Sequence, residues 1–284
     1  MKTNTGVSMR SCVRADFLKG AFLAVGLLLT AAPASAAIIF QDDFSTGNIS
    51  KKLNGAAFWT DNSSNYQQPS ATKLSSITVQ PEVGGGYSVR ALYAGTTNVA
   101  EGARPELRFT LGGQYPELWI SYKVYIPANY YHRNGAVSSN NKFFIIDNMI
   151  GSQFMDFETF PVGNGSDVAN MQLKYNGVNH DFQGGASQWY VGAPEDRGAW
   201  HYYVLHLKVA TSATASDGVS QAWKDGNLVR QFLNLPNYTP GANYFEEGYI
   251  FGASNSGFAV DTELRLDDIT FATTPPLGGP HWMP

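Results

Sequence analysis

The sequence is poor in cysteine, in charged residues and in long hydrophobic runs. Its 284 residues include a single cysteine, Cys12, and only 15% are charged. One cysteine excludes an intramolecular disulfide and a cysteine-only metal site. No hydrophobic run approaches the roughly 20 residues of a membrane-spanning helix, so we expect neither an integral membrane protein nor a membrane partner. The chain is nevertheless 43% hydrophobic, which is too apolar for a disordered protein and predicts a sizeable core.

The first 36 residues are typical of a secretory signal peptide. Four basic residues precede an apolar run at 21–30, and Ala-Ser-Ala at 34–36 forms a small-residue cleavage site. We therefore predict that residues 1–36 are removed. The mature protein would begin at Ala37 and would be secreted, either to the extracellular space or to the periplasm.

Cleavage would remove the cysteine, four of the 19 Lys and Arg, and one of the 23 Asp and Glu. The remaining 15 basic and 22 acidic residues give a net charge of −7. Such a chain has no overall attraction to nucleic acid, which we do not expect as a partner. No low-complexity linker divides the chain, so we predict one domain at 37–274 and a monomer. The Pro- and Gly-rich end at 275–284 predicts an irregular tail.

Short runs of aromatic and β-branched residues, bounded by Gly, Asn, Asp or Pro, recur along the chain and predict strands. They lie at 88–93, 105–111, 118–126, 142–146, 172–175, 200–209, 219–223, 248–253 and 263–271. No window of a dozen residues has a convincing 3.6-residue apolar period, so helices should be few and short. The pattern predicts an all-β fold of packed antiparallel sheets, a sandwich or jelly roll.

Two of these runs alternate in polarity, which assigns their side chains to faces. At 104–109 the charged residues point one way and Pro, Leu and Phe point the other. At 200–208 a face with Tyr202 and His206 alternates with a face of mainly apolar residues. The dipeptide at 225–226, Asp-Gly, predicts a tight hairpin turn because glycine tolerates a positive φ.

Four segments resemble the concanavalin A-like jelly-roll superfamily of secreted carbohydrate-active proteins. They are Gln-Asp-Asp-Phe-Ser at 41–45, Gly-Ala-Trp-His at 198–201, the Asp-Gly, Trp, Asp-Gly hairpin at 217–226, and Leu-Asp-Asp-Ile-Thr-Phe at 266–271. The resemblance implies a β-sandwich of two curved antiparallel sheets. The superfamily includes polysaccharide lyases of the heparin-lyase-like and alginate-lyase-like types, laminarin-degrading glycosidases and non-catalytic lectin modules, so these segments alone leave three functions open.

The run Arg104-Pro105-Glu106-Leu107-Arg108 resembles the Arg-x-Glu-Leu-Arg strand of jelly-roll alginate lyases. A lyase that acts on a uronic-acid polymer must neutralise the sugar carboxylate before the proton at C5 can leave. Arginine suits this task because it binds carboxylates in a bidentate manner, and Glu106 can hold an arginine in place. We therefore predict that Arg104, Glu106 and Arg108 are catalytic. The alternative interpretation is a solvated ladder of ion pairs.

Elimination also needs a proton acceptor and a proton donor. Tyrosine and histidine supply these functions, and we predict that His180 and Tyr202 do so here. Lys142, Tyr175, His206 and Trp223 are the predicted substrate-binding residues, since a lysine adds positive charge to a cleft and aromatic rings stack on sugars. Each residue also has a structural interpretation as part of the core or of a solvated loop.

Two other functions remain open. A carbohydrate-binding module would keep the aromatic residues and perform no chemistry. A laminarinase-type glycosidase would carry Glu-x-Asp-x-Glu on one strand, and the chain has Phe154, Asp156 and Glu158 at these positions. A retaining mechanism needs two carboxylates roughly 5 to 5.5 Å apart, so the phenylalanine at the nucleophile position makes this the weakest of the three.

Acidic pairs near both ends of the mature chain predict a structural calcium ion. Asp42 and Asp43, together with Asp267 and Asp268, would supply hard oxygen ligands if the terminal strands pair. The alternative is that they are ordinary turn and edge-strand acids. We expect no organic cofactor.

Overall fold

The computed structural model describes residues 37–64, 74–133, 141–148, 153–162, 166–175, 178–181, 189–190 and 196–275, with backbone only for 153–190 and for Arg230. These residues all belong to one compact unit, Ser35–Pro284. The predicted signal peptide and almost all of the predicted tail lie outside this part of the chain, so both stay predictions. No helix among the described residues is long and apolar enough to cross a membrane.

In the described part of the chain, two antiparallel sheets of eight strands each make up the fold. Packed antiparallel sheets are what the sequence predicted. Sheet I has the order β16-β15-β14-β8-β18-β6-β5, and β1 also pairs with β18. Its strands are β1 (Ile38–Asp42), β5 (Ser76–Pro81), β6 (Tyr87–Tyr93), β8 (Glu117–Ile126), β14 (Ala199–Lys208), β15 (Gly218–Lys224), β16 (Asn227–Leu235) and β18 (Thr262–Ala272).

Sheet II has the order β12-β11-β10-β9-β17-β7-β4, and β13 also pairs with β11. Its strands are β4 (Trp59–Asp61), β7 (Leu107–Tyr115), β9 (Asn141–Asp147), β10 (Gln153–Val162), β11 (Ser166–Tyr175), β12 (Val178–Asp181), β13 (Trp189–Tyr190) and β17 (Phe245–Ile250). Strands β2 (Lys52–Leu53) and β3 (Ala56–Ala57) form a small separate hairpin. No α-helix occurs among the described residues, so the fold is an all-β jelly-roll sandwich.

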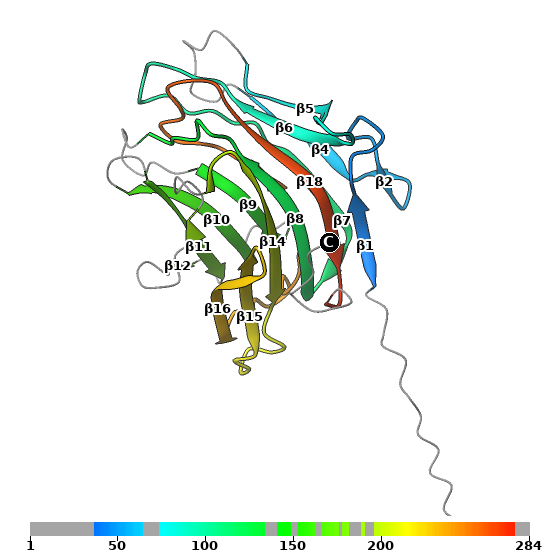
Figure 1. Cartoon of the computed structure of the whole chain (residues 1–284). Helices are drawn as coiled ribbons and strands as arrows, with labels where there is room; N and C mark the ends of the chain where they lie inside the picture. The colour runs from blue at the N-terminus through cyan, green and yellow to red at the C-terminus, as the bar shows by residue number, and fades with distance from the viewer. Residues whose placement is uncertain are drawn as a thin grey trace, which may run out of the picture. The chain divides into compact units, whose positions relative to one another are not determined.

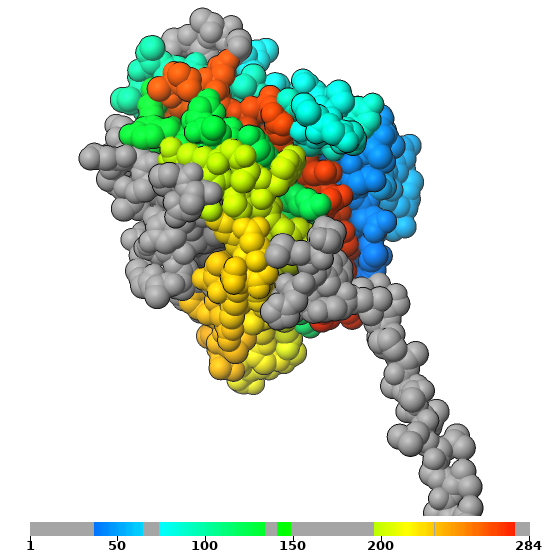
Figure 2. Space-filling model, in the orientation of Figure 1, coloured from blue at the N-terminus to red at the C-terminus, as the bar shows by residue number. Residues whose placement is uncertain are grey.

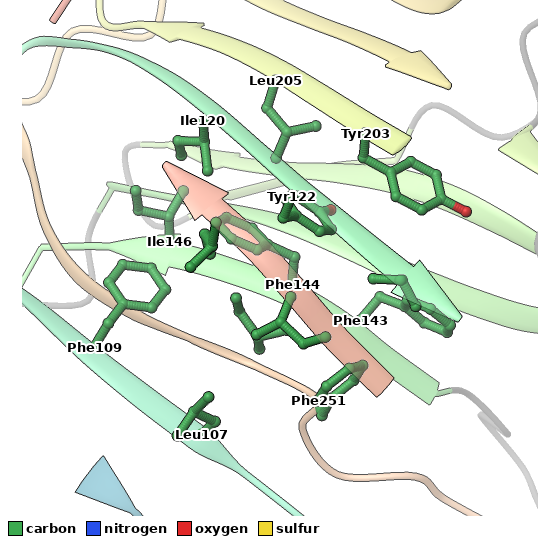
Figure 3. Close-up of a cluster of buried hydrophobic side chains, with 14 of the residues drawn as sticks. Leu107, Phe109, Ile120, Tyr122, Phe143, Phe144, Ile146, Tyr203, Leu205 and Phe251 are labelled. Carbon is green, nitrogen blue, oxygen red and sulfur yellow. The ribbon is translucent and has the colours of Figure 1, made fainter. Parts of the chain in front are cut away.

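Side chains from the two sheets meet in one hydrophobic core (Figure 3). Tyr122 of β8 stacks on Phe144 of β9, with ring centroids 5.6 Å apart and planes 9° from parallel. This contact joins sheet I to sheet II, and Figure 1 shows β14 of sheet I in front of β9 of sheet II. Each large apolar side chain that is fully buried contributes about 1.5 to 3 kcal/mol, so the core fixes which face of each strand points outward.

Alternation in the strands matches the predicted faces. In β7, Leu107 and Phe109 are buried in the core while Arg108 is exposed on the outer face. In β14, Tyr203 and Leu205 are fully buried, and Tyr202 lies on the opposite face. The period of two thus assigns each side chain correctly in both strands.

All nine predicted strands are present, and the Asp225-Gly226 turn is confirmed by positive φ angles of 50° and 78°. The ends of the domain also pair: Phe40 lies opposite Phe271 where β1 joins β18. Figure 2 shows this surface, with the N-terminal segment in blue beside the C-terminal segment in red.

Candidate functional site

A cavity of about 170 Å³ opens on the outer face of sheet II, away from the core. Four adjacent strands, β4, β7, β17 and β9, contribute to it. It is lined by Thr60, Arg108, Phe109, Thr110, Asp147, Glu247, Gly248 and Tyr249. The cavity therefore combines charged, phenolic and hydroxyl groups on a rigid sheet, which is the arrangement expected of a binding or catalytic site.

Strand register places the polar residues of the cavity in two neighbouring rows. In one row Thr60, Arg108 and Tyr249 lie opposite one another across β4, β7 and β17. In the next row Glu247 of β17 lies opposite Asp147 of β9. Residues that face each other across antiparallel strands project to the same side. The two rows are roughly 6.5 to 7 Å apart along the strand, close enough for one sugar residue to contact both.

Gly248 keeps Glu247 and Tyr249 on the outer face. A Cβ atom at this position would lie 2.1 Å from the carbonyl oxygen of Ile145 and 2.6 Å from Cζ of Phe109. Only glycine avoids these contacts, so the ring of Phe109 can pack against the strand from the core side. The close fit fixes the position of the two polar neighbours.

Arg108 is held at the cavity by Glu106. Its Nε donates a 2.6 Å hydrogen bond to Oε1 of Glu106, and this carboxylate also accepts a 2.5 Å bond from Nδ2 of Asn62. The Glu106 side chain is 4% exposed, while that of Arg108 is 52% exposed. The hydrogen bond that Arg108 donates to Glu106 raises the pKa of Arg108. A permanently charged guanidinium is therefore positioned by a buried carboxylate and remains accessible from solvent.

Asp147 occupies an unusual environment. Its Oδ1 atom is buried and has no hydrogen-bond partner within the described part of the chain. Burial raises the pKa of Asp147 to about 7, and the neighbouring negative charge of Glu247 adds to the effect, while Arg108 opposes it. The carboxyl group is therefore neutral in most molecules below pH 7.

Lys142 and Tyr249 meet beside the cavity at Gly252. A Cβ atom on this glycine would lie 2.3 Å from Cε2 of Tyr249 and 3.1 Å from Cβ of Lys142. The Tyr249 ring thus lies directly over the glycine, with the lysine next to it. From behind, the hydroxyl of Tyr93 donates a 3.3 Å hydrogen bond to the carbonyl oxygen of Gly252, which helps to hold this segment in place.

Only part of the predicted Arg104, Glu106 and Arg108 row reaches the cavity. Arg104 precedes β7 and forms an isolated bridge with Ser64. Its Nε donates a 3.0 Å hydrogen bond to Oγ of Ser64, so Arg104 does not line the cavity. The strict alternation expected from the sequence begins at Leu107, where regular pairing of β7 begins.

Tyr202, His206 and Trp223 lie on the outer face of sheet I, on the other side of the core, which corrects the expectation that they share a groove with Arg108. His206 stacks on Trp119 with centroids 4.0 Å apart, and its Nε2 and Nδ1 lie 2.7 Å from Glu117 and 2.9 Å from Gln221.

Trp223 also packs in this cluster. Burial raises the pKa of Tyr202, the opposite of what a proton acceptor needs. The sequence correctly placed Tyr202 and His206 on one face of a strand, but it wrongly placed that face in the same site as Arg108.

His180 and Tyr175 belong to strands whose side chains lie outside the described residues. In register, His180 lies opposite Leu173, in the row that continues to Ile146 of the core face. The Arg108 row instead continues through Ile145 to Asp156. His180 is therefore offset from the cavity row, and its predicted role, like that of Tyr175, stays a prediction.

The acids predicted to bind calcium lie close to the pairing of β1 with β18. Asp42, Asp43 and Asp268 line a second cavity of about 290 Å³, together with Gln41, Lys51, Ile269 and Thr270. The oxygens of Asp42 already accept hydrogen bonds from the backbone N–H of Phe44 and from Nε1 of Trp59, both 2.9 Å long.

Asp268 pairs with Lys123 at 2.7 Å. Burial and the charge of Asp268 raise the pKa of Asp267 to about 7. Among the described residues, no three His, Cys, Asp or Glu side chains are grouped to hold a metal ion. The calcium site stays a prediction.

Sequence reasoning missed Tyr249, Glu247 and Asp147. A signal was present, because the predicted strands at 248–253 and 142–146 carry or adjoin these polar residues. These three residues line one cavity only because β17 lies between β7 and β9. No local sequence pattern reveals that order of strands.

No protein-family model matches the chain, and no curated protein matches it. Solved structures are similar in fold at low sequence identity. The alginate lyase Aly36B, in complex with alginate trisaccharide, is 11% identical with a TM-score of 0.50; the match covers 66% of this chain and 82% of that one.

The endo-β-1,4-glucuronan lyase from the fungus Trichoderma reesei is 14% identical with a TM-score of 0.49, over 84% and 96% of the two chains. The alginate lyase vAL-1 from Chlorella virus is 13% identical with a TM-score of 0.49, over 84% and 100%. At these identities the likeness to Aly36B supports the jelly-roll sandwich fold.

Proposed function

We propose that the protein is a secreted polysaccharide lyase that cleaves a uronic-acid polymer by β-elimination at the cavity of sheet II. The observation that carries the proposal is the guanidinium of Arg108, fixed by buried Glu106 in the same row as Tyr249. The fold shared with an alginate lyase is compatible with it.

Arg108 is suited to bind the carboxylate of the sugar that loses its C5 proton. Its Nε is occupied by Glu106, and a guanidinium still offers terminal N–H groups for a bidentate contact. Neutralising the carboxylate stabilises the negative charge that develops as the proton leaves. A positioned charge of this kind contributes about 2 to 4 kcal/mol to the transition state.

Tyr249 is the group best placed to transfer protons. It lies opposite Arg108 and beside Lys142, and positive charges stabilise a phenolate. The phenolate accepts the C5 proton, the C5–H electron pair forms the C4=C5 double bond, and the C4–O4 bond breaks. The departing oxygen takes a proton back from Tyr249, so the tyrosine ends the cycle as it began.

Incubation of the purified protein with alginate, glucuronan and heparin tests the proposal through the ultraviolet absorbance of the unsaturated product. We expect absorbance to grow with at least one polymer and to be lost in Tyr249→Phe. Binding without absorbance or chain cleavage would instead indicate a carbohydrate-binding module. New reducing ends without absorbance would indicate a hydrolase. Either result would overturn the lyase proposal.

A further inference from the structure

We propose that Asp147, as a neutral carboxylic acid, donates a hydrogen bond to the carboxylate of the bound sugar, so that the cavity selects an unesterified uronate and binds it best below neutral pH. The inference rests on the proposed function only in taking a uronate as the ligand.

The geometry of Asp147 calls for an acceptor in the cavity. Asp147 lines the cavity, and its Oδ1 is buried without a hydrogen-bond partner within the described residues. A buried polar group without a partner is costly. Asp147 also lies directly opposite Glu247, and two facing carboxylates are destabilised when both are ionised. A protonated Asp147 removes the repulsion, and its O–H then needs an acceptor that the ligand can supply.

The charges around Asp147 explain why its ionisation state matters to a ligand. Glu247 and Tyr249 of β17 and Arg108 of β7 line the same cavity. From β10, Phe154 is the register neighbour and Asp156 lies two residues further along. With Asp147 ionised, a sugar carboxylate at Arg108 would also meet the negative charges of Asp147 and Glu247. With Asp147 neutral, one repulsion becomes a hydrogen bond.

Hydrogen bonds from a carboxylic acid to a carboxylate are short and roughly twice as strong as neutral ones. The donor is lost when Asp147 ionises, and its pKa of about 7 places this change near neutral pH. Affinity for a uronate should therefore be high below pH 7 and should fall as pH rises through that value. A methyl-esterified or neutral sugar offers no charged acceptor and should show little of this dependence.

The test is the pH dependence of binding for wild type, Asp147→Asn and a control. The ligand is a saturated oligosaccharide of the polymer that the protein binds, and its Kd is measured by calorimetry from about pH 5 to about pH 9. Wild type should lose about tenfold in affinity per pH unit above the pKa. Asp147→Asn keeps an N–H donor that does not titrate, so its affinity should stay flat across this range. At low pH it should lie within about tenfold of wild type.

The matched control is Asp61→Asn, the same chemical change in the same sheet, at a residue next to the cavity-lining Thr60 and outside the lining. It should keep the wild-type profile. A methyl-esterified oligosaccharide should bind wild type more weakly and with a flat profile, which provides a second measurement that needs no mutation at Asp147. A profile of Asp147→Asn that still falls through pH 7, or a control that becomes flat, would overturn the inference.

The outcomes separate this inference from the lyase proposal. Binding that weakens above pH 7 in wild type and in the Asp61→Asn control but not in Asp147→Asn, without elimination, would retain Asp147 as a uronate ligand and reject the lyase. Elimination, together with a pH dependence of Kd that is the same in Asp147→Asn as in wild type, would support the lyase and reject the role of Asp147. Absence of uronate binding at every pH would reject both.

Discussion

The outer faces of the two sheets carry similar kinds of residues. They differ in whether the polar atoms of their titratable side chains have partners within the protein. On sheet I, both ring nitrogens of His206 contact side chains of the protein, and the ring is stacked on Trp119. On sheet II, Asp147 has a buried oxygen without a partner, and Arg108 is held through Nε alone among the described contacts. Titratable groups whose partners lie within the chain stabilise the fold, whereas those that lack them are the candidates for ligand binding. The indole Nε1 of Trp119 on sheet I is also buried without a partner among the described residues, but it carries no charge and its ring is stacked on His206.

The largest expected effect is a loss of stability when the cluster on the outer face of sheet I is disrupted. Trp119→Ala removes a side chain that is 9% exposed and stacks on both His206 and Trp223. Loss of a buried tryptophan costs about 3 to 5 kcal/mol, so denaturant unfolding should show a drop of that size. The elimination rate per folded molecule should not change. A rate loss that exceeds the loss of folded protein would show that the sheet I face takes part in the reaction.

Arg108→Ala should show the opposite pattern. We expect a loss of about 2 to 4 kcal/mol in transition-state stabilisation, which is about a hundredfold or more in rate. The melting temperature should fall less than in Trp119→Ala, because the Arg108 side chain is half exposed and the buried Glu106 carboxylate keeps its hydrogen bond from Asn62. Initial elimination rates and melting curves on the same sample measure both quantities. Arg104→Ala is the matched variant, since Arg104 does not line the cavity, and it should retain the wild-type rate.

Asp147→Asn tests whether the unpartnered carboxyl group on sheet II lowers the free energy of unfolding at high pH. Burial raises the pKa of Asp147 in the folded state to about 7 from its ordinary value of 3.8. The folded state therefore holds its proton more tightly than the unfolded state. The stability that this provides is complete below about pH 4 and is lost as pH rises through about 7. The substitution should raise the free energy of unfolding by about 1 to 2 kcal/mol at pH 8 and have little effect at pH 4. Urea titrations at the two pH values would contradict this if the shift were equal at both.

The smallest effect concerns calcium at the β1–β18 end of sheet I. A bound ion stabilises the folded state by about 0.4 kcal/mol when its concentration equals Kd, and by more at higher occupancy. If Asp43 and Asp268 bind calcium, its addition to chelator-treated protein should raise the melting temperature modestly. Asp43→Asn should remove that rise. An identical melting temperature with and without calcium would end the hypothesis.

Much of the fold followed from local pattern, whereas the site did not. Strand β7 was predictable because Leu107 and Phe109 alternate with polar residues, and the hairpin at Asp225-Gly226 because few dipeptides favour that turn. The sequence assigned Tyr202 to the same site as Arg108, since its strand has a polar face. Alternation of faces, however, does not specify which sheet a strand joins. That depends on which distant strands become neighbours, as β7 and β17 do around Tyr249.

The pairing of β1 with β18 has a consequence for how the molecule is made. The first strand of the domain finds its partner only when the last strand has been synthesised, so sheet I stays incomplete until β18 has left the ribosome. Such a chain is slow to close its longest-range contacts. The backbone N–H of Thr273 donates a 3.0 Å hydrogen bond to the carbonyl oxygen of Ala37. A short peptide could therefore join the two ends, and new termini could be opened at the turn between Glu82 and Gly86, giving a circular permutant that keeps every strand of both sheets.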